Sequence, residues 1–193
     1  MRVTKEKAAE NRARILAAAA RLFRERGLSG VGVDALGEAA GMTYGSLYSQ
    51  FGSKERLAAE ALAEALAGSP GKAALEDAAP GSGALGGFVA RYLSARHRDE
   101  PGQGCALAAL GCEIPRQPPA VRRAFTEGVR AAAGRIARLL PEGRRQPPEE
   151  ALAVMAALVG AMVLARAVDD PALSERILAA ARDHLAEDMP ASA

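Results

Sequence analysis

The stretch VDALGEAAGMTYGSLYSQFGSKERL, residues 33–57, decides the fold. Its apolar residues recur at helical spacing in two short segments that are separated by Gly41. Gly41 suits the left-handed C-cap of the first segment, and Thr43 suits the N-cap of the second. Leu47 and Phe51 lie one turn apart on the face that the second segment buries. The spacing therefore predicts a helix-turn-helix over about residues 34–51.

Helical periodicity extends on both sides of this pair of helices. Apolar residues at spacings of three and four predict a first helix from Lys5 to Arg26, and Gly27 ends it. Gly52 ends the second short helix, and Ser53 caps a fourth helix that runs over residues 53–67. We expect residues 1–52 to form a three-helix domain, with the fourth helix as its connector to the rest of the chain.

Residues 68–83 have the Gly-, Pro-, Ser- and Ala-rich composition of a linker, so we place the domain boundary there and expect a second domain over residues 68–193. Beyond the linker, prolines separate further segments with helical periodicity. These segments cover residues 84–98, 105–114, 119–140, 148–168 and 172–188. No stretch alternates with period two, so the sequence predicts an all-α protein of about nine helices.

The composition agrees with a folded, helical chain. Of the 193 residues, 49% are hydrophobic and 25% charged, which excludes a largely disordered protein. The formal net charge is only +2, but residues 1–60 carry ten Lys and Arg against seven Asp and Glu. This positive excess fits an N-terminal segment near an anionic partner; the alternative is an ordinary solvated helix face.

The exposed face of the second short helix indicates the nature of that partner. It carries two tyrosines, small hydroxyl residues, a glycine and a glutamine, but no carboxylate. Such a helix can enter the major groove of DNA without repelling the phosphates. The residues that we expect on this face are Thr43, Tyr44, Gly45, Ser46, Tyr48 and Gln50.

Residues 10–60 resemble the DNA-binding domain of the TetR family of bacterial transcriptional regulators. The resemblance rests on ILAAAARLFRERG (15–27) and on the pattern AAG-x-T-x-G-S-LY-x-x-F-x-SKE-x-L within residues 33–57. It implies a sequence-specific regulator that binds a double-stranded DNA operator, with helix-turn-helix reading heads and a C-terminal domain for ligand binding and dimerisation.

The resemblance also implies a role for individual positions. The residues that it places at base edges or in the groove are Tyr44, Gly45, Ser46 and Gln50. The residues that it places at phosphates are Thr43, Tyr48, Lys54 and Arg12. Where the family often has Thr or Ser, this chain has Val31 and Gly32, so backbone N–H groups would have to bind phosphate there. The alternative is that the tyrosines, Gln50 and Lys54 are ordinary surface residues.

One recognition helix buries too little surface for tight specific binding, so a homodimer is expected. Segment 148–168 is apolar nearly all round, and with segment 172–188 it looks like the family's dimerising helix pair. Its small residues would let a second helix approach closely. They are Ala153, Ala156, Ala157, Gly160 and Ala161. The alternative is the central core helix of a monomer.

The resemblance assigns the helices within residues 84–140 to a ligand-receiving core. Few polar residues are expected to point inward there, which favours a small apolar or aromatic effector that releases a repressor from its operator. The candidate lining residues are Phe88, Tyr92, Leu107, Leu110, Phe125, Val129, Met155, Leu158 and Met162. Each of them could equally be simple core.

Cys105 and Cys112 are too few for a disulfide framework. On one helix their Cα atoms would lie about 10 Å apart, beyond the ~7 Å limit for a disulfide, so we expect inert buried thiols. A thiol-responsive regulator that senses through either cysteine is the alternative. Zinc bound by the cysteines with His97 and His184 would have no recognised spacing, so no metal or other cofactor is expected.

Other classes of protein find little support in the sequence. The chain has two histidines and lacks G-x-S-x-G, H-E-x-x-H and phosphate-loop motifs, so we do not expect an enzyme; a Cys105–His97 pair would have no visible orienting partner. A helical interaction module without DNA function would not need the polar face of residues 43–50. No signal peptide is visible and the apolar run 151–165 is short for a bilayer, so we expect a cytoplasmic protein without a membrane span.

Overall fold

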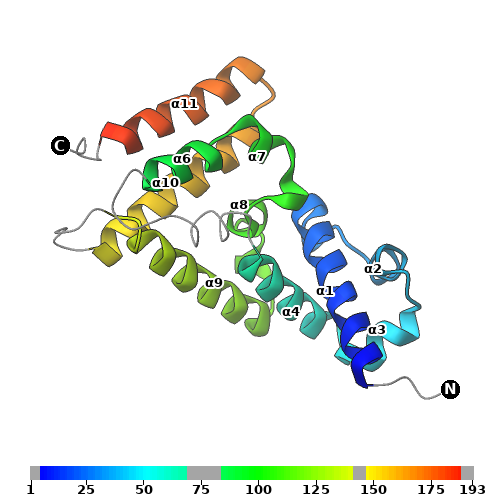
Figure 1. Ribbon diagram of the computed structural model, residues 1–193. Helices are drawn as coiled ribbons and strands as arrows, with labels where there is room; N and C mark the ends of the chain where they lie inside the picture. The colour runs from blue at the N-terminus through cyan, green and yellow to red at the C-terminus, as the bar shows by residue number, and fades with distance from the viewer. Residues whose placement is uncertain (1–4, 69–83, 141–146, 188–193) are drawn as a thin grey trace. The chain divides into compact units, whose positions relative to one another are not determined.

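The structure is a computed structural model that describes residues 5–68, 84–140 and 147–187. These residues form ten α-helices and two 3₁₀ turns, and they contain no strand (Figure 1). The all-α class predicted from the periodicity is confirmed. The chain divides into two compact units, residues 1–68 with 105–128 and residues 69–104 with 129–193, which we describe separately.

The first unit begins with four helices whose bounds follow the predicted ones closely. They are α1 (Lys5–Arg26), α2 (Val33–Ala40), α3 (Tyr44–Phe51) and α4 (Lys54–Ala67). α1 packs along α4 and across α2, so α4 belongs to this unit and is more than a connector. The core is built from large side chains that are almost completely buried. These are Ile15, Phe23, Val31, Leu36, Leu47, Phe51 and Leu62.

The helix ends carry the caps that the sequence predicts. Gly41 is left-handed at φ +64°, and its N–H donates to the carbonyl groups at the end of α2. Thr43 caps α3 by accepting a hydrogen bond from the N–H of Ser46, and Ser53 caps α4 by accepting from the N–H of Arg56. These caps fix the tight corner between α2 and α3 and thereby the direction of α3.

The segment after Gly104 folds with the N-terminal helices, although the sequence suggests one domain over residues 68–193. Residues 105–128 contain α8 (Ala106–Leu110), a 3₁₀ turn (Ile114–Arg116) and the first part of α9 (Pro119–Ala137). α8 packs on α1 and α4, and it buries Leu107 and Leu110. Burial of this short apolar helix explains why the first unit extends beyond the N-terminal domain.

The second unit contains the rest of the described chain. Its elements are α6 (Ala84–Tyr92), α7 (Ala95–Asp99), a 3₁₀ turn (Pro101–Gln103), the end of α9, α10 (Pro147–Ala167) and α11 (Pro171–Glu187). α10 packs on α11 and α7, and α6 packs on α11. The predicted single segment 84–98 is broken between α6 and α7, because the hydroxyl of Ser94 accepts a hydrogen bond from the N–H of His97 and starts a new helix.

Arginines from the two long helices hold these short helices in place. Arg166 of α10 donates hydrogen bonds to the carbonyl oxygens of His97 (2.5 Å) and Arg98 (3.0 Å) at the end of α7. Arg182 of α11 donates to the carbonyl of Leu93, just after α6. Carbonyl groups at helix ends lack partners within the helix, so the guanidinium groups satisfy acceptors that would otherwise need water.

α10 spans 21 residues, as many as the predicted segment 148–168, and much of it is exposed. In the described part of the chain, Pro148–Ala167 is the one stretch long and apolar enough to cross a membrane, with a mean hydropathy of 1.8. A core helix of a soluble protein passes the same test, but here only 39% of the apolar window is buried within the chain. A large part of this apolar helix therefore remains exposed in a single protomer.

Candidate nucleic-acid interface

The recognition helix α3 presents a small, acid-free outer face. Leu47 and Phe51 are each 1% exposed and fix the inner face, while Gly45 and Tyr48 lie on the outer one. A Cβ at Gly45 would meet no heavy atom within 4 Å, so the backbone at this turn is open to close approach. The side chain of Tyr44 lies outside the described part of the structure. Its place as the first residue of α3 is described.

Two of the predicted groove residues are less available than the sequence suggests. Ser46 is half-buried, and its hydroxyl lies 3.6 Å from the sulfur of Met42. Gln50 is also half-buried. The sequence missed Ser49, which is exposed on the same side as Gly45 and whose hydroxyl donates to the carbonyl of Ser46. A helical step of 100° could have found it, because residues 45 and 49 are one turn apart.

Tyr48 and Lys54 both line a small surface depression. Val33, at the first turn of α2, also lines it, as do residues of α3 and α4. Lys54 is exposed in the first turn of α4, where the helix dipole is positive. The lining is mostly apolar, with Tyr48, Ser53 and Lys54 beside Val33, Leu47, Phe51 and Leu57. Tyr48, Lys54 and the N-termini of α2 and α4 thus lie near one another, and groups of these kinds bind phosphate.

The surroundings of Val31 and Gly32, at the start of α2, do not favour the Thr or Ser that the resembled family often has there. Val31 is completely buried, so a hydroxyl residue there would lose core packing. Gly32 is the N-cap of α2, and no side chain caps the helix among the described residues. The backbone N–H groups in the first turn of α2 can therefore donate to water or to a ligand, as the sequence predicts.

Arg12 has a structural role inside the unit. Its guanidinium donates a 2.9 Å hydrogen bond to the carbonyl of Gln50 and forms an ion pair with Glu60. Its Cζ also lies 4.3 Å from the centre of the Phe51 ring. Because these contacts join α1 to the end of α3 and to α4, Arg12 positions the recognition helix.

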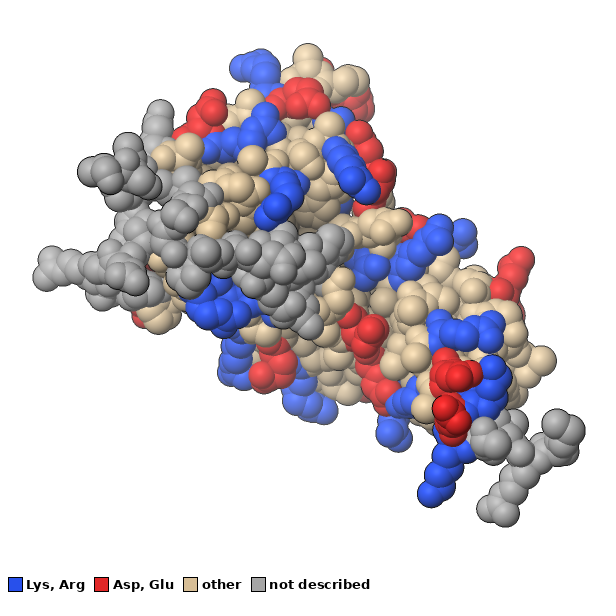
Figure 2. All heavy atoms as spheres, viewed as in Figure 1, with Lys and Arg blue, Asp and Glu red and all other residues tan. Residues whose placement is uncertain are grey.

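The charge on this unit is mixed. On the face drawn in Figure 2, Lys and Arg alternate with Asp and Glu over α1, and no large patch of one sign covers that helix. Several of these charges are already paired with neighbours one turn away, such as Lys7 with Glu10 and Arg21 with Glu25. The hydrogen bond from Lys7 holds the pKa of Glu10 below its ordinary value. The interface is therefore defined by α3 and the depression beside it.

The nine candidate effector residues are distributed over both units. In the first unit, Leu107 and Leu110 are buried and Phe125 is half-buried. In the second unit, Phe88, Leu158 and Met162 are buried, while Tyr92, Val129 and Met155 are half-buried. The ring centres of Phe88 and Tyr92 are 5.8 Å apart, so these two candidates do come together.

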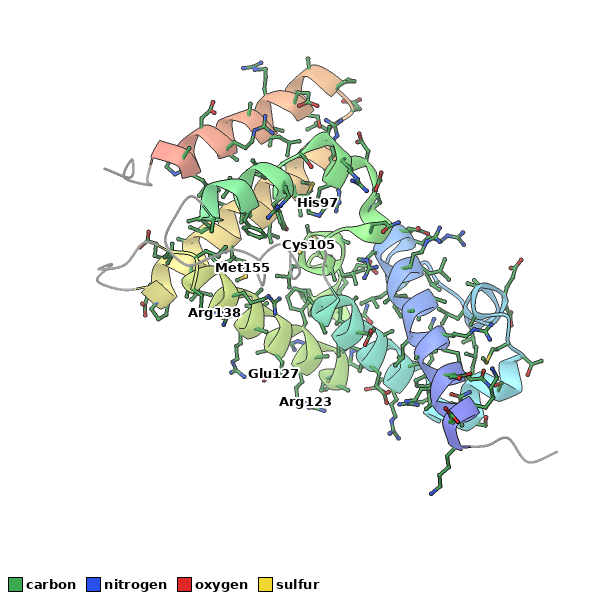
Figure 3. The ribbon with its side chains drawn as sticks, in the orientation of Figure 1. His97, Cys105, Arg123, Glu127, Arg138 and Met155 are labelled. Carbon is green, nitrogen blue, oxygen red and sulfur yellow. The ribbon has the colours of Figure 1, made fainter. Side chains whose placement is uncertain are left out.

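His97 joins this aromatic pair. The sequence suggests it only as a candidate metal ligand or catalytic partner. Its ring meets Tyr92 edge-on with 4.5 Å between ring centres, and its Nδ1 donates to the carbonyl of Tyr92 at 2.6 Å. Burial lowers the pKa of His97 below its ordinary value, although the hydrogen bond to Tyr92 opposes this shift and Arg166 adds to it. His97 is labelled in Figure 3 on α7.

The two cysteines differ in their surroundings, and no disulfide joins them. Cys105 is buried at the start of α8 (Figure 3), but Cys112 is exposed, so the expectation of two buried thiols is wrong for Cys112. α8 ends at Leu110, before Cys112. Arg24 of α1 is electrostatically coupled to Cys105; burial lowers the pKa of Arg24 and Cys105 partly offsets this. Within the described residues, no three His, Cys, Asp or Glu side chains gather at a metal-sized site.

The predicted dimer residues mostly lie on the exposed side of α10. Ala153 and Ala156 are exposed, and Ala157 and Gly160 are half-buried. The same helix exposes Leu152 (46%) and Leu164 (56%), which are about 3.3 turns apart and lie at the two edges of this side. Ala161, the fifth of these residues, is buried within its own unit.

Comparison with protein families decides the identity. Residues 15–61 match the model of the bacterial regulatory proteins of the tetR family, and residues 81–181 match the tetracyclin repressor-like C-terminal domain. The chain belongs to the TetR family. It is therefore a DNA-binding transcriptional regulator, and α2 and α3 are its helix-turn-helix. A search of curated protein sequences finds no significant match.

Solved structures share the whole fold at low sequence identity. Reduced NemR from E. coli is 23% identical, with a TM-score of 0.76 over 95% of this chain and 98% of NemR. A TetR-family regulator from Cytophaga hutchinsonii is 20% identical, with a TM-score of 0.75 over 100% of both chains. One from Agrobacterium tumefaciens is also 20% identical, with a TM-score of 0.74 over 95% of this chain and 100% of its own.

Proposed function

We propose that this TetR-family regulator is a repressor that binds a palindromic operator as a homodimer and leaves it when a small apolar or aromatic effector binds. The observation that carries the proposal is the acid-free outer face of α3 beside the depression that holds Tyr48 and Lys54. A groove-reading face and a phosphate site side by side are what a DNA half-site requires.

The site residues divide into two kinds of contact. Tyr44, Gly45 and Gln50 meet base edges or the groove, and exposed Ser49 joins them. Ser46 stays at the edge of the groove because its hydroxyl faces Met42. Thr43, Tyr48 and Lys54 bind phosphates, together with the first turn of α2. Arg12 supports α3 from behind.

The exposed apolar stripe of α10 supports the homodimer. A monomer would leave Leu152 and Leu164 in water, whereas a second copy would bury them with Ala153, Ala156 and Gly160 between them. The two reading heads would then meet half-sites ~34–36 Å apart. The family's proteins typically act as dimers on operators, which fits this arrangement.

The aromatic pair of α6 supports an apolar or aromatic effector. Tyr92 is half-buried against Phe88 and His97, so an aromatic compound could stack on groups already arranged edge to face. Release from the operator requires that the effector bind better to the conformation that cannot bind DNA. A thermal-shift screen of small apolar and aromatic compounds tests this: hits should raise the melting temperature and weaken DNA binding.

A gel shift with DNA from upstream of the protein's own gene tests the proposed function as a whole. At a stated salt concentration, we expect saturable binding to a near-palindromic site and weaker binding to a scrambled fragment. Equal binding to both fragments would contradict sequence-specific regulation. Footprinting should show two protected half-sites one helical turn apart.

A thiol-responsive regulator is the second candidate, and the surroundings of the cysteines favour it. Cys112 is exposed, so an oxidant in solution can reach its thiol. NemR, which has the same fold, was solved in a form described as reduced. If the protein senses oxidants through its thiols, the thiol oxidant diamide should weaken DNA binding by the wild type. It should not weaken DNA binding by the variants Cys105→Ser or Cys112→Ser. Equal binding with and without diamide excludes it.

A further inference from the structure

A carboxylate from outside the N-terminal domain holds the turn between α1 and α2. Glu113, which precedes the 3₁₀ turn at Ile114–Arg116, accepts hydrogen bonds from the backbone N–H groups of Leu28 (3.1 Å) and Ser29 (3.0 Å). Each of its two carboxylate oxygens takes one N–H. The contact spans more than 80 residues of sequence within one compact unit.

The turn is shaped to receive this carboxylate. Gly27 ends α1 with φ +78°, a left-handed conformation that side chains rarely adopt. A Cβ on Gly27 would lie 2.3 Å from the carboxylate oxygen of Glu113, which is far inside van der Waals contact. A side chain at position 27 and a carboxylate from position 113 therefore cannot occupy this place together.

The turn, residues 27–32, leads directly into the DNA-binding surface. Leu28 is buried, and Val31 after it is completely buried. Gly32 then caps α2, whose first turn lines the depression beside Tyr48 and Lys54. A change in the position of Leu28 and Ser29 would therefore move the first turn of α2.

Glu113 lies in a segment that is continuous with the C-terminal part of the chain. The N-terminal family match ends at residue 61, and the C-terminal one includes Glu113. α9, which follows at Pro119, begins in the first unit and ends in the second. The chain thus carries a C-terminal-domain residue into contact with the turn before α2.

We propose that Glu113 is a positioning residue for DNA binding, which sets the α1–α2 turn and, through it, the first turn of α2. The inference rests on the proposed function. Glu113 touches no DNA; it acts through the N–H groups of Leu28 and Ser29.

Two measurements on the full-length protein test this. By amide hydrogen exchange, Glu113→Ala should speed exchange at Leu28 and Ser29 while core amides such as that of Leu62 stay protected. By fluorescence anisotropy on the upstream DNA, it should weaken binding about tenfold, a typical coupling between sites. The slope of affinity against salt should stay unchanged, since no phosphate contact is lost. Glu113→Gln, which keeps one acceptor oxygen, should restore part of the affinity.

Gly27→Ala should weaken operator binding at least as much as Glu113→Ala, because it displaces the carboxylate and also places alanine at φ +78°, where it is strained. The double variant should lose less than the sum of the two single losses, since residues in contact are not additive. Glu64→Ala, which removes an exposed carboxylate from α4, is the matched control and should bind as the wild type does.

Three results would overturn the inference: unchanged exchange at Leu28 and Ser29, wild-type affinity of Glu113→Ala, or faster exchange at every core amide alike. If the wild type itself does not prefer the upstream DNA to scrambled DNA, the proposed function fails instead. The exchange measurement then still decides whether Glu113 holds the turn.

Discussion

The guanidinium of Arg12 joins α1, α3 and α4. The resemblance to the TetR family implies a phosphate contact for this residue. The structure instead gives it the carbonyl of Gln50, the carboxylate of Glu60 and the face of Phe51. The sequence could not show this, because all three partners lie 38 or more residues further along the chain.

Replacement of Arg12 tests which role dominates. Arg12→Ala should lower the free energy of unfolding by about 2 kcal/mol, because a charge-assisted hydrogen bond and a partly exposed cation–π contact are lost. Arg12→Lys should lose less, since it keeps the charge. Urea denaturation measures both, and Arg26→Ala, at an exposed position of α1, is the control. A change in the salt dependence of DNA binding with unchanged stability would favour the phosphate role instead.

His97 should make the stability of the protein depend on pH. Burial lowers the pKa of His97, so the unfolded chain binds the proton more readily than the folded one. The free energy of unfolding should therefore fall as the pH drops below the ordinary value of about 6.5. Protonation would also place a second positive charge beside Arg166.

Urea denaturation between about pH 7.5 and 5.5 measures this effect, since Asp and Glu titrate at lower pH. His97→Gln should remove most of the slope in that window. His184→Gln, at the exposed histidine of α11, should leave it unchanged. An equal slope in both variants would show that His97 is not the responsible group.

Among the elements, the helix-turn-helix and α4 were the most predictable from sequence. Gly41, Thr43 and Ser53 signal their caps locally, and Leu47 and Phe51 signal the buried face of α3. These signals suffice because each cap depends on residues within one turn of the helix end. The outer face of α3 was predicted less well: helical geometry turns Ser46 and Gln50 partly inward and Ser49 outward.

The elements after the linker were less predictable, because long-range contacts define them. α7 exists as a separate helix because Ser94 caps its start and Arg166 binds the carbonyls at its end. Arg166 lies 68 residues beyond its partner Arg98. Apolar periodicity alone merges α6 and α7 into one segment. Ser94 is a local cap signal that periodicity does not use, whereas the contacts of Arg166 have no local signal.

Lys54, in the first turn of α4, should contribute to DNA binding without reading sequence. Lys54→Ala should weaken binding to specific and to scrambled DNA by the same factor. It should also reduce the slope of log affinity against log salt concentration by about 1, because one phosphate contact is lost. Tyr44→Ala should instead change the preferred sequence. Fluorescence anisotropy over a range of salt concentrations measures both effects.

The matched control for Lys54 is Arg123→Ala, which removes an equal charge from an exposed side chain that points away from α9 (Figure 3). It should leave the salt slope unchanged. If Lys54→Ala and Tyr44→Ala cause equal losses on every DNA sequence, the division into phosphate and base contacts is wrong.

For the molecule as a whole, the division of the chain could not be read from the sequence. The linker composition of residues 68–83 marks one boundary. No local sequence signal shows that residues 105–128 belong to the first unit. They do so because α8 packs against α1 and α4. The same packing brings Glu113 to the α1–α2 turn.

The exposed stripe of α10 gives the last prediction. Leu164→Glu should place a charge where the proposed homodimer is apolar, and burial of an unpaired charge is strongly unfavourable. Sedimentation velocity should therefore show monomers for this variant and dimers for the wild type at the same concentration. Binding to a full operator should weaken far more than binding to an isolated half-site, because only the full operator benefits from two linked heads. Ala90→Glu adds the same charge at an exposed position of α6 and should remain dimeric. A wild type that sediments as a monomer, or a Leu164→Glu variant that stays dimeric, would remove α10 from the interface.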